Sequence, residues 1–309
     1  MHAEHALKKQ KDAENKMLKI RSISPEAAGN SWLLQFGKSA VIYDTGFACM
    51  ADETVNKARQ LLGDNHIENI LISHSHYDHA SGTAVFAKNF PEATVSAGAY
   101  AAYVFTRPGA IRTMRDMNLN AAHMYGRKPN DETIGEIHID RELHDGDIVE
   151  AEEYSFEAWE TPGHTKCSIS YFCPEESLLL ASETIGVPNS TVTLDGDFIV
   201  MPCCMVGVES GLKAIRRAIE ADPQKILLSH TGLVTGGHAR IFLRKSLEWL
   251  ERARDLVLKG ADEGKDLPQL IAEWKKIFYT EEVAKKQPEA AFDLNTSYAV
   301  PAILKEYGR

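Results

Sequence analysis

The sequence predicts an α/β protein, and three observations support this fold class. Between residues 66 and 98 an apolar strand, a short helix and a second strand follow one another, which is typical of α/β layers. Between residues 135 and 183 short apolar segments alternate with polar turns, which indicates a second sheet. From about residue 238 apolar residues recur every three or four positions, which predicts a helical extension.

Local signals justify the individual elements. Residues 31–46 hold two apolar runs around a Gly-Lys pair, as a β-hairpin does. Residues 51–63 begin with an acidic pair and end in glycine, which predicts a helix. Residues 99–130 interrupt the α/β rhythm. They are rich in Ala, Met and Tyr and are broken at "RPG", so we expect a helical insertion there. The segment "GEIHI" (135–139) is expected to open the second sheet.

These elements divide the chain into three expected parts. Residues 1–20 are expected to be an N-terminal tail, because they are polar and carry little pattern. Residues 21–237 are expected to form the main domain, with the insertion at about 99–130. Residues 238–309 are expected to form the C-terminal helical extension.

Composition and charge exclude several functional classes. The chain has 309 residues, of which 44% are apolar and 25% charged, as in ordinary globular proteins. Its formal net charge of -10 argues against a nucleic-acid binder, which needs a basic face. There is no signal-peptide pattern, and no apolar run is long enough to span a membrane. The five cysteines form no CxxC pair, so we expect buried free thiols and a cytoplasmic location.

The segment "LISHSHYDHASG" (71–82) places His74, His76, Asp78 and His79 at the end of a predicted strand. Residues two apart on an extended segment share a face, so the first two histidines can present their imidazoles to one metal ion. The last two residues lie where the strand turns toward the next helix, and they can face a second ion. A lone histidine is usually a surface or core residue, but four ligand-type residues in six positions predict a metal site.

A catalytic zinc has three protein ligands and an open water position, so other strand ends should supply further ligands. His164 lies in the Pro-Gly-His turn of "ETPGHTKCSISYF". Glu183 follows the apolar run "LLLAS", and His230 follows "KILLS". Each residue therefore lies where a sheet edge presents side chains into a cleft.

This series of motifs resembles the metallo-β-lactamase superfamily of hydrolases. The resemblance rests on the HxHxDH motif, the Pro-Gly-His turn, an acid after a strand, and a late histidine at a strand end. The segment "IYDTG" (42–46) also resembles the early Asp-Thr-Gly turn of the family. The resemblance implies an αββα sandwich with a dinuclear metal centre at one edge of the sheets.

The resemblance also implies roles for individual residues. The ligands of the first ion would be His74, His76 and His164. The ligands of the second ion would be Asp78, His79 and His230. The bridging carboxylate would be Glu183, and Asp44 would orient a ligand histidine. Asp78 would also pass a proton to the leaving group.

Glu183 departs from the family pattern, because most members have aspartate at the bridging position. The extra methylene moves the carboxylate roughly 1.5 Å further from the backbone. The glutamate can therefore bridge two ions or bind only one. Zinc is the first expectation for the metal, with iron and manganese as alternatives. The nearest cysteines along the chain, Cys167 and Cys173, do not occupy the ligand position of the zinc β-lactamases, so antibiotic hydrolysis is not expected.

The expected function is hydrolysis of an ester-type bond in a small molecule by a metal-bound hydroxide. The insertion and the helical tail resemble those of the quinolone-signal response thioesterases of this superfamily, which favours a thioester or lactone. A phosphodiesterase is an alternative, supported by Arg112, Arg115, Arg127 and Lys128 in the insertion. A metal-binding regulatory protein with little turnover is another, favoured by Glu183. The amphipathic C-terminal helices are a candidate homodimer surface.

Overall fold

The computed structural model describes residues 18–25, 30–128, 134–285 and 287–309. The chain divides into two compact units. The first comprises Met1–Leu143 and Ile148–Phe156, and the second comprises His144–Asp147 and Glu157–Arg309. The expected N-terminal tail lies outside the described residues, apart from its last three positions.

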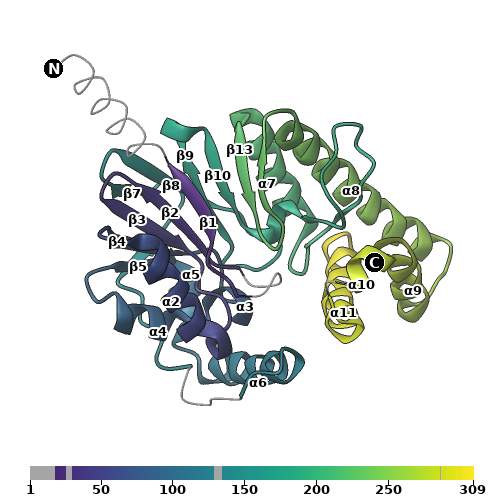
Figure 1. Cartoon of the computed structure of the whole chain (residues 1–309). Coiled ribbons are helices and arrows are strands. Elements are labelled where there is room, and N and C mark those ends of the chain that lie inside the picture. The colour runs from purple at the N-terminus through teal and green to yellow at the C-terminus, as the bar shows by residue number, and fades with distance from the viewer. Residues whose placement is uncertain (1–17, 26–29, 129–133, 286) are drawn as a thin grey trace. The chain divides into compact units, whose positions relative to one another are not determined.

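The first unit contains a six-stranded sheet with the strand order β1-β2-β3-β4-β5-β6 (Figure 1). The strands are β1 (Lys19–Ser22), β2 (Trp32–Phe36), β3 (Ser39–Tyr43), β4 (His66–Ile72), β5 (Thr94–Gly98) and β6 (Arg141–Leu143). The pairs β1–β2 and β2–β3 are antiparallel, and the strands from β3 to β6 are parallel. The carboxyl ends of these four parallel strands therefore meet at one edge of the sheet, where polar side chains can gather.

Short helices connect the strands of the first unit, and Figure 1 shows α2, α4 and α5 beside its sheet. They are η1 (Ala48–Met50), α2 (Ala51–Leu62), α3 (Tyr77–Ala80), α4 (Thr83–Asn89), α5 (Ala99–Phe105) and α6 (Pro108–Met124). Helix α2 has the predicted acidic first turn and ends at Gly63, whose φ of 60° breaks the helix. Proline at the first position of α6 explains the break at "RPG", because its fixed φ suits a helix start.

The second sheet has the strand order β14-β13-β10-β9-β8-β7. Its strands are β7 (Ile148–Ala151), β8 (Tyr154–Glu160), β9 (Ile169–Cys173), β10 (Leu178–Ala181), β13 (Lys225–Leu228) and β14 (Gly232–Thr235). Strand β10 is buried along its whole length and pairs parallel with β13 and antiparallel with β9. Strand β7 and the first three residues of β8 belong to the first unit, and the other strands of this sheet belong to the second. A separate antiparallel ribbon joins β11 (Val187–Pro188) to β12 (Val200–Met201).

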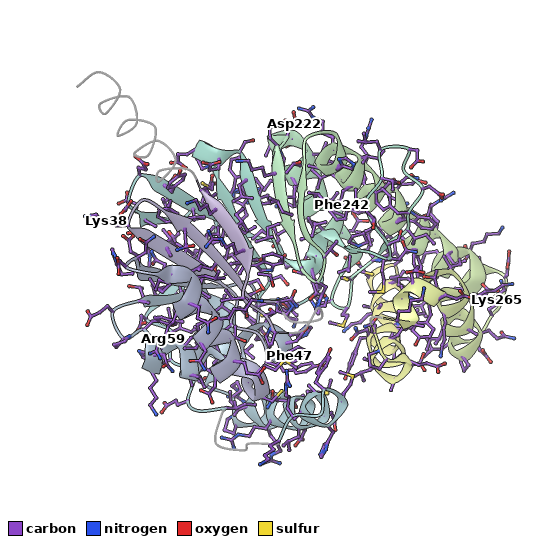
Figure 2. All side chains as sticks on the ribbon, in the orientation of Figure 1. Lys38, Phe47, Arg59, Asp222, Phe242 and Lys265 are labelled. Carbon is purple, nitrogen blue, oxygen red and sulfur yellow. The ribbon has the colours of Figure 1, made fainter. Side chains whose placement is uncertain are left out.

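Most of the remaining elements of the second unit are helices. They are η2 (Pro174–Glu176), η3 (Glu183–Ile185), α7 (Val208–Ala221), α8 (Gly237–Asp262), α9 (Leu267–Phe278), α10 (Glu281–Ala284) and α11 (Glu289–Glu306). Phe242 of α8 is fully buried in the apolar core of this unit (Figure 2), together with Trp274 and Phe292 from the later helices. The helical tail is thus part of the same core as β10 and β13.

The last helix is also joined to α7 by a polar contact. The backbone N–H of Val208 donates to the Glu306 carboxylate at 2.6 Å, and that of Glu209 donates to it at 3.4 Å. Both donors lie at the start of α7, where the first N–H groups of a helix have no partner within it. A negative charge there also complements the helix dipole. The end of α11 therefore caps the beginning of α7.

Two sheets flanked by helices confirm the predicted α/β class, and the hairpin of β2 and β3 is also confirmed. The expected strand at 135–139 is wrong. Instead, Asp140 exchanges two hydrogen bonds with the backbone of Val95, at 2.8 and 2.9 Å, and β6 then pairs with β5 in the first sheet. Strand β14 was missed because "GLVTGG" carries three glycines, and only its pairing with β13 makes it a strand. The division at residue 237 stays a prediction.

No helix among the described residues combines the length and apolar character needed to cross a membrane.

Candidate metal centre

The N-terminal ligand group comprises His74, His76, Asp78 and His79, and it follows directly after β4. His76 precedes the first residue of α3, and Asp78 lies in the first turn of that helix. The backbone N–H groups of His79 and Ala80 donate to the His76 carbonyl at 3.2 and 2.9 Å. The ring of His74 lies 4.6 Å from that of His76 and 4.1 Å from that of His79, measured between centroids. The short turn therefore places the imidazole of His74 next to those of His76 and His79.

A buried carboxylate orients this group. Asp44 accepts hydrogen bonds from the Ser73 backbone at 2.7 Å, the Ser73 hydroxyl at 2.8 Å and Nδ1 of His79 at 2.7 Å. Because Nδ1 of His79 donates its proton to the carboxylate, Nε2 is the nitrogen with a lone pair, and the Asn30 side-chain amide donates to it at 3.1 Å. A metal ion bound by Nε2 would replace this contact. Asp44 has a φ of 57°, a conformation that aspartate tolerates better than most residues. This hydrogen bond is the contact that we expected of Asp44.

Backbone hydrogen bonds fasten the Asp-Thr-Gly turn to the histidine motif. The N–H groups of Thr45 and Gly46 both donate to the His79 carbonyl, at 2.7 and 3.0 Å. The N–H of Gly82 donates in turn to the Gly46 carbonyl at 3.1 Å. A side chain at Gly82 would lie 2.5 Å from the Thr45 carbonyl oxygen, so glycine is required for this close approach. The two segments, which are distant in sequence, therefore form one rigid turn.

An aromatic cluster in the first unit packs against Tyr77, which lies within the histidine motif. The Phe47 ring, labelled in Figure 2, lies 5.7 Å from that of Tyr77 and 5.6 Å from that of Tyr125. The Asn118 side chain of α6 accepts a hydrogen bond from the Cys49 backbone at 3.1 Å. Tyr77, which lies inside the motif, therefore packs against Phe47, and helix α6 is anchored beside η1.

The C-terminal ligand group comprises His164, Glu183 and His230, and all three residues belong to the second unit. Glu183 is the first residue of η3, directly after β10, and His230 follows β13 with a left-handed φ of 60°. Oε2 of Glu183 lies 3.5 Å from Nε2 of His164, and Oε1 lies 3.0 Å from Nε2 of His230. The carboxylate therefore lies between the two imidazoles, with one oxygen toward each.

The Thr184 side chain links the segment that follows Glu183 to the turn that carries His164. The Thr184 hydroxyl donates to the Thr161 carbonyl at 2.6 Å and accepts from the His164 backbone N–H at 3.2 Å. Gly163 has a φ of 150°, and a side chain there would lie 2.7 Å from Cγ2 of Thr184. The turn that carries His164 therefore packs directly against the residue after Glu183.

Three buried hydroxyl groups close to this contact form hydrogen bonds with one another. Thr161 lies 3.1 Å from Ser170 and 2.9 Å from Ser182, and the Ser170 and Ser182 hydroxyls are 3.2 Å apart. The backbone N–H of Ser182 also donates to the Ser170 hydroxyl at 3.0 Å. Buried hydroxyls need partners, and here they satisfy one another across the ends of β8, β9 and β10.

Cys203 is a nearby residue that the sequence did not indicate. Its thiol belongs with His164 and Glu183 to a buried group whose ligand atoms all lie within 4.8 Å of one another. Burial raises the pKa of the Cys203 thiol well above its usual value, and the Glu183 carboxylate raises it further. In the sequence Cys203 is distinguished only by its neighbour Cys204, and this pairing does not specify a partner.

The donor set of both groups fits a divalent metal ion. Imidazole nitrogens and carboxylate oxygens are ligands of zinc, iron and manganese, and most of these side chains are buried. Buried charges require partners, which a cation supplies. The chain therefore contains a His/Asp/Glu cluster able to hold a metal.

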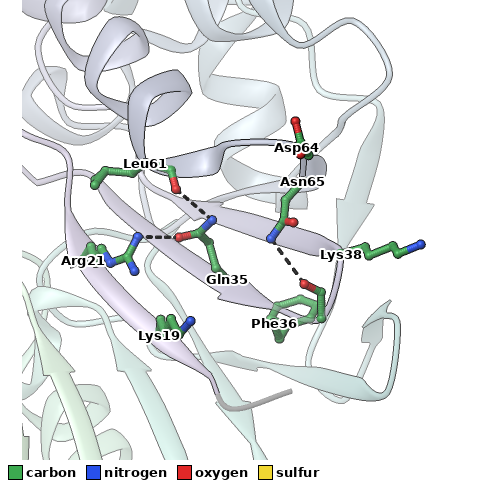
Figure 3. A pocket seen from close by; sticks show the side chains of 9 residues that line it. Lys19, Arg21, Gln35, Phe36, Lys38, Leu61, Asp64 and Asn65 are labelled. Carbon is green, nitrogen blue, oxygen red and sulfur yellow. Dashed lines mark hydrogen bonds between the residues drawn. The ribbon is translucent and has the colours of Figure 1, made fainter. Parts of the chain in front are cut away.

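A hollow of about 570 Å³ in the first unit has a different character (Figure 3). It lies at the opposite ends of the strands, around the β2–β3 turn, and its lining includes neither histidine nor cysteine. Arg21 donates to Gln35 at 2.8 Å, and Gln35 donates to the Leu61 carbonyl at 3.0 Å. These polar groups satisfy one another, so the hollow does not present the chemistry of a reaction site.

Comparisons with known proteins agree with these features. The sequence profile of the metallo-beta-lactamase superfamily matches residues 25–262. A metallo-beta-lactamase family protein from Thermus thermophilus is 19% identical with a TM-score of 0.63, over 94% of this chain and 93% of that one. An archaeal superfamily protein from Sulfolobus tokodaii is 13% identical with a TM-score of 0.54, over 94% and 99%. The sec-alkylsulfatase Pisa1 from Pseudomonas sp. is 16% identical with a TM-score of 0.61, over 94% and 49%.

At these identities the solved structures establish the fold, while the profile establishes the family. The profile covers most of the chain, and it includes both ligand groups and the Asp-Thr-Gly turn. It confirms the resemblance inferred from the "HSHYDH" motif. The chain therefore belongs to the metallo-beta-lactamase superfamily and is a hydrolase of that fold.

Proposed function

We propose that this hydrolase cleaves an ester-type bond in a small molecule, with thioesters and lactones as the first candidate substrates. In this proposal the N-terminal and C-terminal ligand groups together bind two divalent metal ions. Zinc is the first candidate, and iron and manganese are alternatives. The family profile supports the joint use of the two groups, because it spans both of them.

The Glu183 carboxylate is the observation that carries the proposal. In the proposed assignment, His164 binds one ion and His230 binds the other. One oxygen of Glu183 lies beside each of these histidines, at 3.5 and 3.0 Å. A carboxylate that bridges two ions needs this divergent arrangement. The longer side chain of glutamate is therefore compatible with a dinuclear centre.

When bound, the metal ions supply a water molecule of near-neutral pKa and polarise the scissile bond. The residues of the chain provide the positioning and the proton. Asp44 holds His79 in one tautomer through its 2.7 Å hydrogen bond. We assign proton delivery to the leaving group to Asp78, whose Oδ2 lies 3.6 Å from Nε2 of His79. Its side chain is 16% exposed, so water can reach it.

The preference for thioesters and lactones over phosphodiesters rests on the residues around α6. A phosphodiester would need free positive charge near the metals. Arg127, one of the basic candidates, forms an ion pair with Glu53 of α2 at 3.1 Å. The exposed side chain of Met124 offers an apolar surface for an acyl group, whereas Met114 is buried in the first unit. A cytoplasmic location and a homodimer stay predictions, and the five free cysteines are compatible with a reducing compartment.

The test combines elemental analysis with a substrate panel. Protein purified without chelator should contain about two divalent ions per chain, as a two-metal site requires. It should hydrolyse an acyl thioester or a lactone faster than a bis-phosphodiester. Chelation should abolish turnover, and zinc should restore it. Glu183→Gln should lower the metal content, while Glu183→Asp should retain it. Asp52→Asn, which changes an exposed carboxylate in the first turn of α2, is the matched control.

Three outcomes would contradict all or part of the proposal. A full metal content without turnover of any ester in the panel would favour the metal-binding regulatory protein. A metal-free protein that cannot be loaded with zinc, cobalt or manganese would reject the ligand assignment itself. Faster cleavage of the phosphodiester would support hydrolase activity but reject thioesters and lactones as the preferred substrates.

A further inference from the structure

A buried thiol lies beside two of the proposed metal ligands in the second unit. The ligand atoms of His164, Glu183 and Cys203 all lie within 4.8 Å of one another. We propose that Cys203 is a direct metal ligand and that, with His164 and Glu183, it binds one thiophilic divalent ion. This inference rests on the proposed function and identifies the class of metal that its centre prefers.

The β11–β12 ribbon brings the thiol to this position. Val187 of β11 pairs with Met201 of β12 in antiparallel register. Glu183 lies four residues before Val187, and Cys203 lies two residues after Met201. The ribbon therefore returns the chain to the carboxylate that it left about twenty residues earlier. This placement depends on strand pairing and cannot be read from the local sequence.

A glycine allows this ribbon to close tightly. Gly186 has a φ of 89°, which favours glycine over residues with a side chain. A Cβ atom there would lie 2.5 Å from Cγ1 of Val200 and 3.1 Å from the carbonyl oxygen of Met201. The chain between Glu183 and the ribbon is thus packed directly against the strand that leads to Cys203.

The segment that follows Cys203 is tied to the other ligand-bearing turn. The backbone N–H of Val206 donates to the Gly163 carbonyl at 2.9 Å, next to His164. Cys203 therefore lies between two anchored points, the β12 pairing on one side and the His164 turn on the other. A thiol fixed in this way is positioned in advance for coordination and does not need a loop to move.

The distances suit a metal ion with nitrogen, oxygen and sulfur ligands. Around a tetrahedral zinc ion, neighbouring ligand atoms lie about 3.3 to 3.8 Å apart. Nε2 of His164 and Oε2 of Glu183 are 3.5 Å apart. The thiol makes a long contact of 3.7 Å to the Met201 carbonyl and also interacts with the backbone of Val187. In this proposal Sγ of Cys203, Nε2 of His164 and the Glu183 carboxylate would hold the ion, and the thiol would bind it as a thiolate, with its proton released to solvent.

The neighbouring cysteine provides a matched control. Cys204 is almost fully buried and belongs to the apolar core cluster of the second unit, which also contains Val208 and Leu212. Its ligand atom is not part of the group formed by His164 and Glu183. Cys203→Ser and Cys204→Ser therefore remove one sulfur atom each from adjacent positions, but only the first removes a proposed ligand.

The experiment uses Co²⁺ as a spectroscopic probe in the full chain. Apo protein of the wild type and the two variants is titrated with Co²⁺, and near-ultraviolet absorption reports thiolate-to-cobalt charge transfer. We expect this band in the wild type and in Cys204→Ser, and its loss in Cys203→Ser. Affinity for Cd²⁺, measured by competition, should fall at least about tenfold in Cys203→Ser, as it does when metal-site partners are removed. Affinity for Mn²⁺, which prefers oxygen ligands, should change much less.

Several results would overturn the inference. These are a Co²⁺-loaded wild type without the charge-transfer band, a Cys203→Ser variant that keeps the band, and equal losses of Cd²⁺ and Mn²⁺ affinity. Circular dichroism of each apo variant verifies the fold, and Cys203→Ala repeats the test with a side chain that has no donor atom. Ester turnover is measured separately. Turnover without the band rejects the cysteine ligand alone, and the band without turnover rejects the hydrolase proposal alone.

Discussion

The two ligand groups are held in place by different chemistry. In the N-terminal group a single buried carboxylate, Asp44, bonds directly to the imidazole of His79 and to the segment before His74. In the C-terminal group neutral hydroxyls bond to the backbone, and Thr184 links the His164 N–H to the Thr161 carbonyl. Among the residues outside each group, a charged carboxylate therefore orients the first group, whereas packing and neutral hydrogen bonds orient the second.

The two kinds of contact should affect different properties. A carboxylate changes the basicity of the bonded histidine, whereas a hydroxyl bonded to the backbone changes the stability of the fold. Hydrogen bonds to an ionised group are roughly twice as strong as neutral ones, and a carboxylate makes the bonded imidazole a better metal ligand. A hydroxyl that bonds to the backbone affects the position of a turn but not the electron density of the imidazole. We therefore expect changes at Asp44 to appear in metal binding and changes at Thr184 to appear in stability.

The largest expected effect is that of Asp44→Asn. The variant loses the negative charge next to Nδ1 of His79, so zinc affinity should fall about 10- to 100-fold. Zinc titration of the apo protein against a competing chelator measures this affinity. Asp52→Asn, an exposed change in the same unit, should leave it unaltered. Unchanged zinc affinity in Asp44→Asn would show that the charge of Asp44 does not control metal binding by the N-terminal group.

A smaller effect is expected for Thr184→Val. This substitution keeps the shape but leaves the His164 N–H and the Thr161 carbonyl without their hydroxyl partner. The free energy of unfolding of the apo protein should fall by about 1–3 kcal/mol. Denaturant unfolding measures it. Thr184→Ser keeps the hydroxyl and should recover most of the loss. A large drop in zinc affinity with unchanged stability would show that both groups are controlled in the same way.

The smallest effect is expected for Glu306→Gln at the end of α11. The amide has one acceptor oxygen, so it keeps the stronger of the two hydrogen bonds from α7 but loses the second one and the favourable interaction with the helix dipole. The free energy of unfolding should fall by roughly 0.3–1 kcal/mol, without a change in zinc affinity. Glu220→Gln removes an exposed negative charge near the other end of α7, where it is unfavourable, and should not destabilise the protein. Equal losses in both variants would argue against the capping role.

Much of the fold follows from local sequence. The hairpin around Gly37 and the helix that ends at Gly63 have the predicted positions, and the chain after residue 237 is largely helical as predicted, because apolar periodicity and glycine act over a few residues. Pairing between distant segments was not predictable in the same way. Strand β6 joined the first sheet through contacts of Asp140 with Val95, and β14 exists only through its register with β13.

The sequence by itself determined which residues are candidate metal ligands and in which order they occur. Histidines and acids follow apolar strands, and the carboxyl ends of parallel strands gather polar side chains, so the order of residue types alone indicates their chemistry. Only the tertiary structure decided that one oxygen of Glu183 faces each of two histidines and that Cys203 lies beside His164. These relations depend on a positive φ at Gly186, a two-stranded ribbon and a hydrogen bond from Val206. Each of them joins residues that are far apart in sequence, and local patterns carry no information about such contacts.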